Sequence, residues 1–121
     1  MPDLHHRTIL IVEDEYLLAC ELESELRQAG ALVLGPVGSV QDALDLVASG
    51  QHVDGAILDV NLQGAAVFPV ADMLADRDVP FVFTTGYDDL VLPDRLRDTL
   101  RYEKPLDIAA VLRRIRQMID G

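Results

Sequence analysis

The stretch ILIVEDE, residues 9–15, places four apolar residues directly before three acidic ones. Residues 9–12 have the composition of a buried β-strand, so residues 13–15 would stand at the carboxyl end of that strand. Carboxylates crowded together repel one another, and at the mouth of a core this costs stability unless a positive group lies nearby. The stretch therefore predicts a strand end that holds a cation.

Apolar runs of similar length recur along the chain and predict further strands. Each run is short and nearly uninterrupted, as in strands that are buried on both faces of a sheet. The expected strands are residues 8–12, 31–37, 55–60, 80–85 and, with a weaker pattern, 100–103.

Helical periodicity fills most of the intervals between these strands. In the first interval, leucines recur every fourth residue from Leu18 to Leu26, which is typical of an amphipathic helix. We expect Ser39 to cap the second helix and Asp107 the last one, and Pro69 to stand in the first turn of the third. The interval DDLVLPDRLRDT, residues 88–99, has weak periodicity and an interior proline, Pro93. Such a proline costs a helix about 3 kcal/mol, so we expect the fourth helix to be short or irregular.

The alternation of strands and helices predicts a doubly wound α/β fold with a five-stranded parallel sheet and helices on both faces. We expect a single domain over residues 1–121, with its core at about 7–119 and a flexible tail at 1–6. Ligands of such folds bind outside the carboxyl ends of the strands.

Charge and composition exclude several classes of function. The formal net charge of −11 argues against binding to nucleic acid, whose phosphates need a basic surface. No apolar run approaches the roughly 20 residues that cross a bilayer, and the amino terminus lacks the apolar stretch of a signal peptide. Cys20 is the only cysteine, which excludes an internal disulfide and favours the cytoplasm.

Polar residues stand at the carboxyl ends of the expected strands. Glu13 and Asp14 end the first strand, Asp59 the third and Thr85 the fourth, and Lys104, the only lysine, follows the fifth. These ends meet at one edge of a parallel sheet. Clustered carboxylates are typical of a Mg²⁺ site, and a lysine and a hydroxyl beside it suit a phosphoryl group.

Four short motifs stand in order on these strand ends: VEDE at 12–15, LDV at 58–60, TTG at 84–86 and EKP at 103–105. With them the chain resembles the receiver domain of two-component response regulators, which has a flavodoxin-like fold. The resemblance implies that Asp59 is the phosphoryl acceptor. It also implies the roles of five further residues: Asp14 as a Mg²⁺ ligand beside Asp59, Asn61 as a ligand through its backbone carbonyl, Glu13 as a ligand through water, Lys104 as the cation that holds a phosphoryl oxygen, and Thr85 as the switch hydroxyl.

Simpler interpretations exist for the same residues. Taken alone, Glu13 and Asp14 are better explained as acids at the positive end of a helix dipole, and we expect Glu15 to do only that. Lys104 alone could be a solvated surface residue, yet arginine supplies every other positive charge of the chain. Thr84 and Thr85 are ordinary strand residues by propensity.

The sequence departs from the receiver pattern at several positions. Arg101 stands where many receivers carry an aromatic switch residue, and strand alternation turns the adjacent Tyr102 to the opposite face. The fourth strand incompletely resembles a subgroup with a Phe-Ala-Thr-Gly-aromatic-Tyr signature, because Thr84 replaces the alanine and Tyr87 follows the glycine directly. We expect Tyr87 to prolong the phosphorylated state by screening Asp59 from water, although a half-buried loop tyrosine is an equal alternative.

The resemblance implies a phosphoacceptor signalling protein, not a turnover enzyme, that takes its phosphoryl group from a sensor histidine kinase or a histidine phosphotransferase. The alternative is a pseudo-receiver that binds its partner without phosphate. A flavin-binding or hydrolytic α/β protein is a third class, but its glycine-rich loop or serine elbow is missing.

We expect a stand-alone receiver without an output domain, which would act by binding another protein, or a second copy of itself, through residues of about 88–119. The alternative is that these 121 residues are part of a longer regulator. Residues 1–94 hold 3 basic and 17 acidic residues, whereas residues 95–121 hold 7 basic and 4 acidic ones. Opposite charges steer partners together, which favours an acidic partner. The arginines concerned are Arg95, Arg97, Arg101, Arg113, Arg114 and Arg116.

Overall fold

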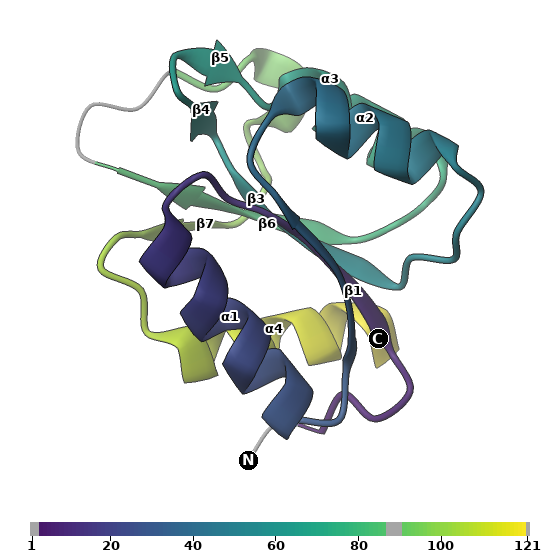
Figure 1. Ribbon diagram of the computed structural model, residues 1–121. Helices are drawn as coiled ribbons and strands as arrows, with labels where there is room; N and C mark the ends of the chain where they lie inside the picture. Colours follow the sequence, from purple (N-terminus) through teal and green to yellow (C-terminus); the bar gives the residue numbers. More distant parts are fainter. Residues whose placement is uncertain (1–2, 87–90, 121) are drawn as a thin grey trace.

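A computed structural model describes residues 3–86 and 91–120 of the chain (Figure 1). Five parallel strands form one sheet in the order β2-β1-β3-β6-β7, the arrangement of a doubly wound fold. The strands are β1 (Thr8–Val12), β2 (Leu32–Val37), β3 (Gly55–Asp59), β6 (Phe81–Thr85) and β7 (Arg101–Glu103). The helices are α1 (Tyr16–Gln28), α2 (Val40–Ala48), α3 (Phe68–Asp76) and α4 (Ile108–Asp120). The predicted fold class is confirmed.

The helices cover both faces of the sheet. In Figure 1, α1 and α4 lie against one face and α2 and α3 against the other. Side chains alternate along each strand, so each strand supplies both layers. On β3, for example, Ile57 packs in the α1/α4 layer and Leu58 in the α2/α3 layer. This alternation also decides which layer each residue at the strand ends faces.

The expected helix signals are present in the structure. The Ser39 hydroxyl accepts a hydrogen bond from Asp42 N at 3.1 Å, and Asp107 Oδ1 accepts one from Ala110 N at 3.2 Å. Pro69 lies in the first turn of α3. Each cap satisfies an amide N–H that no helical carbonyl can reach.

The connection between β6 and β7 contains little helix in its described part. Pro93 precedes a single turn of 3₁₀ helix, η1 (Asp94–Leu96), whose Leu96 is buried in the core. Residues 91–100 have no other helix. The irregular fourth helix is therefore confirmed for these residues, whereas Tyr87 lies outside the described part of the chain.

The expectation of a flexible tail over residues 1–6 is wrong for Leu4. Its side chain is fully buried in the α1/α4 layer, and its amide donates to Ala29 O at 2.9 Å. His6 N likewise donates to Gly30 O at 3.3 Å. A single leucine among polar residues has no periodicity to identify it, so only the packing at the end of α1 shows that it belongs to the core.

A small hairpin, absent from the sequence predictions, follows β3. It consists of β4 (Asn61–Leu62) and β5 (Ala65–Ala66), which pair antiparallel. Gln63 and Gly64 both have positive φ, 54° and 90°, as a two-residue type I′ turn requires. The hairpin fixes the chain immediately after Asp59.

None of the helices in the described residues has both the length and the apolar character that a membrane span requires.

Candidate functional site

Lys104 occupies the centre of the acidic edge that the sequence predicted. Its Nζ lies 3.0 Å from Asp59 Oδ2, 3.1 Å from Glu13 Oε2 and 3.6 Å from Glu15 Oε1. Only 16% of its side chain is exposed. Lys104 is therefore the positive group that a strand ending in three acids needs.

Three carboxylates converge beside this lysine. Glu13, Asp14 and Asp59 each place an oxygen within 4.8 Å of the others, with Glu13 and Asp59 buried and Asp14 half-buried. The end of β1 supplies the first two and the end of β3 the third. Asp59 Oδ1 also accepts a hydrogen bond at 3.1 Å from the backbone N of Asn61, the first residue of β4.

The electrostatics of the site leave negative charge uncompensated. Burial, and then the neighbouring Glu13 carboxyl, raise the pKa of Asp59 to about 8, and the opposing effect of Lys104 is smaller. Burial alone would lower the pKa of Lys104, but hydrogen bonds and charges from Asp59 and Glu13 outweigh it and raise this pKa. Lys104 thus stays cationic, and its charge offsets only part of the rise in the pKa of Asp59.

The donor set fits a hard divalent cation. Glu13 Oε1 is buried without a hydrogen-bond partner among the described residues, so it has a free lone pair inside the site. All three side chains offer oxygen atoms, which Mg²⁺ prefers, and Mg²⁺ is commonly held by one or two carboxylates and several waters. Glu13, Asp14 and Asp59 can hold such an ion, the first of them through a metal-bound water.

Thr85 reaches the same edge of the sheet without joining the cluster. It ends β6, is half-buried, and accepts a hydrogen bond from Lys104 N through its backbone oxygen at 2.8 Å. Its hydroxyl makes no hydrogen bond to Asp59 or Lys104 in the described structure. Strand alternation places it on the α2/α3 side, with Phe83. The ladder pairs Asp59 with Thr84, not with Thr85.

Two residues have surroundings that the sequence did not reveal. Glu15 was expected to act only as a helix cap, but its side chain makes no capping bond and lies near Lys104 instead. Thr84 was treated as an ordinary strand residue, yet it is fully buried with an unpartnered hydroxyl. The only feature of the sequence that distinguishes Thr84 is that it stands where the receiver subgroup signature has an alanine.

Residues of the β6–β7 and β7–α4 region lie largely as expected. Tyr102 packs partly buried against the α1/α4 layer, while Arg101 is exposed. Three of the six arginines already have acidic partners, because Arg95 binds Asp72, Arg97 binds Asp94 and Arg116 binds Asp120. The other three of these six arginines, Arg101, Arg113 and Arg114, have no ion pair among the described residues.

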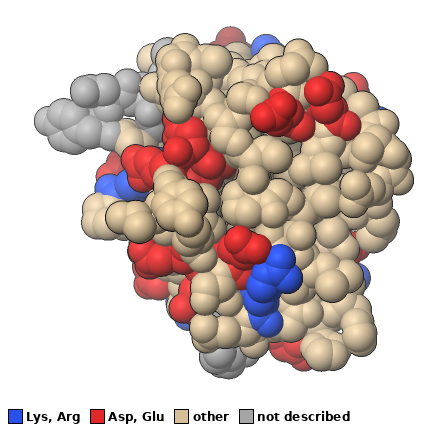
Figure 2. Space-filling model, viewed as in Figure 1, with Lys and Arg blue, Asp and Glu red and all other residues tan. Residues whose placement is uncertain are grey.

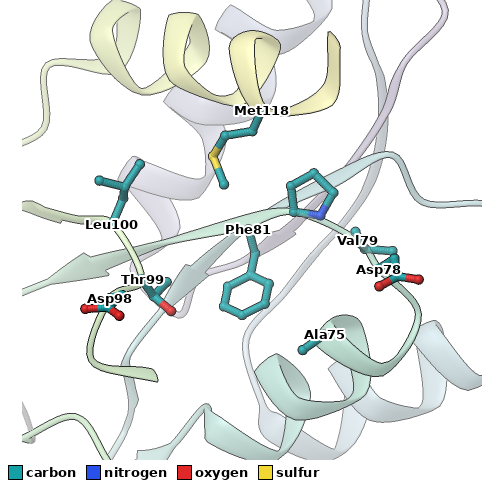
Figure 3. A pocket seen from close by; sticks show the side chains of 9 residues that line it. Ala75, Asp78, Val79, Phe81, Asp98, Thr99, Leu100 and Met118 are labelled. Carbon is teal, nitrogen blue, oxygen red and sulfur yellow. The ribbon is translucent and has the colours of Figure 1, made fainter. Parts of the chain in front are cut away.

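Two surface hollows among the described residues lie outside the carboxylate cluster. One pocket of about 530 Å³ lies at the amino-terminal ends of β6 and β7, where Phe81, Leu100 and Met118 surround it (Figure 3). Another, of about 520 Å³, lies beside the site, between Leu17 of α1 and Ile108 of α4, with Lys104 on its rim. Figure 2 shows the molecule from the same side as Figure 1, and on this surface acidic side chains are more common than basic ones.

Comparisons with known proteins point to one family, although no family model matches the chain. The transcriptional regulatory protein PdtaR of Mycobacterium tuberculosis is 32% identical over 93 residues, which cover 76% of this chain and 45% of that protein. The phyllosphere-induced regulator PhyR of Methylorubrum extorquens is 28% identical over 106 residues, 85% of this chain and 40% of that protein. This chain thus spans less than half the length of these curated relatives.

Solved structures match over nearly the whole chain. SdrG from Sphingomonas melonis Fr1 has a TM-score of 0.81 at 41% identity, covering 96% of this chain and 98% of that one. A response regulator receiver protein from Sinorhizobium medicae WSM419 also has a TM-score of 0.81, at 28% identity and 98% coverage of both chains. A BeF₃-activated SdrG from Pseudomonas melonis Fr1 is 42% identical, with a TM-score of 0.73, covering 93% of this chain and 95% of that one.

Proposed function

We propose that this chain, which belongs to the receiver-domain family of response regulators, accepts a phosphoryl group on Asp59 from a phosphohistidine. The donor is a sensor histidine kinase or a histidine phosphotransferase. The observation that carries the proposal is the single lysine of the chain held between two buried carboxylates, with Nζ 3.0 Å from Asp59 and 3.1 Å from Glu13.

The transfer uses groups that lie at this edge of the sheet. An Asp59 carboxylate oxygen attacks the phosphorus in line, the bond from phosphorus to the donor histidine nitrogen breaks, and its electron pair returns to the imidazole. Lys104 holds an oxygen of the transferred group. Mg²⁺ bound by Glu13, Asp14 and Asp59, with the backbone carbonyl of Asn61, would offset the charge on the transferred oxygens.

The raised pKa of Asp59 supports a requirement for the metal. A protonated carboxyl is a poor nucleophile, and the pKa of Asp59 is about 8 with only Lys104 to oppose Glu13 and burial. A divalent cation beside the carboxylate favours its ionised form. Mg²⁺ held by these carboxylates would favour the ionised Asp59 and would offset the charge of the incoming group.

The donor would approach over the hollow beside Lys104. Leu17 and Ile108 line this hollow, and Tyr16 and Leu17 on α1 are 78% and 77% exposed. Apolar residues this exposed next to a charged site are typical of a protein contact. A phosphohistidine on a docked helix would then lie next to Lys104.

The output is a change in protein binding, so the chain is a signalling protein and not a turnover enzyme. Residues of about 88–119 form the proposed docking region, and Arg101, Arg113 and Arg114 are its unpaired cations among the described residues. An acidic partner, or an acidic patch of a second copy, fits this charge. Capture of the phosphoryl group by Lys104 and Thr85 would shift the population of states in this region.

Phosphorylation with a small phosphodonor tests the function directly. Incubation with acetyl phosphate and Mg²⁺ should add one phosphate to the wild type and none to Asp59→Asn, as intact-mass measurement would show. Asp76→Asn, a change at an exposed acid of α3, is the matched control and should be labelled like the wild type. Equal labelling of Asp59→Asn would contradict the assignment, and no labelling of the wild type would favour the phosphate-independent pseudo-receiver.

A further inference from the structure

Thr84 carries a buried hydroxyl that the proposed chemistry has not yet used. The residue is fully buried, and its Oγ1 has no hydrogen-bond partner in the described structure. The only other buried side-chain atom in this condition there is Glu13 Oε1, which belongs to the carboxylate cluster. An unpaired buried hydroxyl is unfavourable, and valine would fill the same space without it.

The sheet places this hydroxyl beside the acceptor. Asp59 and Thr84 are direct partners in the ladder between β3 and β6, and neighbouring strands lie about 4.8 Å apart. Two residues earlier, Ile57 and Val82 both pack in the α1/α4 layer. By alternation, Asp59 and Thr84 face that same side. Thr85, in contrast, faces the opposite layer.

Asp59 has the capacity to accept a further hydrogen bond. Its carboxylate accepts from Asn61 N and from Lys104 Nζ, and an ionised carboxylate offers about four lone-pair sites. The backbone oxygen of Thr84 is already taken by Val60 N. Rotation of the Thr84 side chain about one bond is enough to change the direction of its hydroxyl.

We propose that the Thr84 hydroxyl is a third donor to the Asp59 carboxylate and that it shortens the lifetime of the phosphorylated state. This rests on the proposed function of Asp59. Thr84 acts as a positioning residue, because it binds the acceptor side chain and not the phosphoryl group.

The direction of the effect follows from where charge develops during hydrolysis. A water oxygen attacks the phosphorus, the bond from phosphorus to the Asp59 oxygen breaks, and its electron pair remains on the carboxylate while the water proton leaves with the phosphate or the solvent. Negative charge thus grows on Asp59 in the transition state, so a donor there speeds hydrolysis. Its loss should prolong the lifetime about fivefold, which corresponds to about 1 kcal/mol.

The test compares two substitutions of Thr84: valine keeps the size of the side chain and removes the hydroxyl, whereas serine keeps the hydroxyl and removes a methyl group. After removal of the phosphodonor at constant Mg²⁺, the phosphorylated fraction is followed by mass spectrometry. Thr84→Val should decay about fivefold more slowly than the wild type, and Thr84→Ser should decay at nearly the wild-type rate. Thr8→Val, at the amino end of β1, is the control and should leave the rate unchanged. If Thr84→Val keeps the wild-type rate, the proposal is overturned.

A second measurement is independent of phosphorylation. In the Mg²⁺-bound protein, a slowly exchanging Thr84 hydroxyl proton should give a nuclear Overhauser contact to the Asp59 Hβ protons, and its absence would overturn the contact. If the wild type takes no phosphate, the proposed function of Asp59 is wrong, but the proposed hydrogen bond from Thr84 to Asp59 is still tested by this measurement. Thermal melts in EDTA test for a packing defect. The hydroxyl has no partner in the structure without metal, so Thr84→Val should there melt at the wild-type temperature or above it.

Discussion

The Lys104 ammonium group lies within 3.1 Å of both Asp59 and Glu13, so one cation is shared by two buried carboxylates. The consequences of this sharing are open to measurement in the protein without metal and without phosphate.

Replacement of the shared cation should destabilise the metal-free protein. Lys104→Met leaves two buried carboxylates without their shared cation, and we expect a loss of about 2 kcal/mol in the free energy of unfolding, limited by proton uptake. Urea denaturation in EDTA measures the loss. Arg113→Met, at an exposed position of α4, is the control and should change stability by less than about 0.5 kcal/mol. An equal loss in both variants would show that the contacts of Lys104 contribute no more to stability than those of an exposed arginine.

The raised pKa of Asp59 predicts a pH dependence of stability in EDTA. The folded state holds the Asp59 proton more tightly than the unfolded state, since the pKa rises from 3.8 to about 8. The resulting stability is fully present below pH 3.8 and is lost as the pH rises towards 8. Asp59→Asn should remove this part of the pH dependence and be the more stable protein at pH 8. Parallel pH profiles for the two proteins would contradict the prediction.

Metal binding should depend on Asp14 more than on Glu13. Asp14 is the more accessible acid of the cluster and a proposed direct ligand, whereas Glu13 is proposed to act through water. Mg²⁺ should raise the melting temperature of the wild type and, to a smaller extent, of Glu13→Gln, but not of Asp14→Ala. If Mg²⁺ raises the melting temperature of Asp14→Ala as much as that of the wild type, the ion binds elsewhere.

Activation should change the connection between β6 and β7 more than any other part of the chain. Among its described residues, one 3₁₀ turn is tied to α3 by Arg95, which binds Asp72 through two hydrogen bonds of 2.9 Å. With beryllofluoride and Mg²⁺, hydrogen exchange should slow in peptides covering residues 86–100 more than elsewhere. Asp59→Asn is the control and should show no change. Slowing confined to another face would contradict the proposed docking region.

The sequence predicted the strands and the acidic edge well for physical reasons. Buried parallel strands are nearly uninterrupted apolar runs, so each observed strand lies within one residue of its predicted bounds at either end. Parallel strand ends must share one edge, which brings Asp14, Asp59 and Lys104 together from distant parts of the chain. The local sequence pattern and the topology of a parallel sheet were therefore sufficient to predict the strands and the acidic edge.

What remained hidden depends on contacts between distant side chains. Leu4 belongs to the core only because the end of α1 lies next to it, and Glu15 approaches Lys104 across 89 positions of sequence. Thr84 and Thr85 have the same strand propensity, and only the register assigns them to opposite layers. The expected role of Tyr87 stays a prediction, since that residue lies outside the described chain.

Because Lys104 is the only lysine of the chain, its place in the carboxylate cluster also makes it a chemical reporter. Reagents that acylate primary amines can modify only this side chain and the amino terminus. Its raised pKa keeps the ammonium form dominant, so the amine should react slowly while Asp59 and Glu13 hold it. The rate of acylation at one defined atom would then follow the occupancy of the site in solution, with no added label.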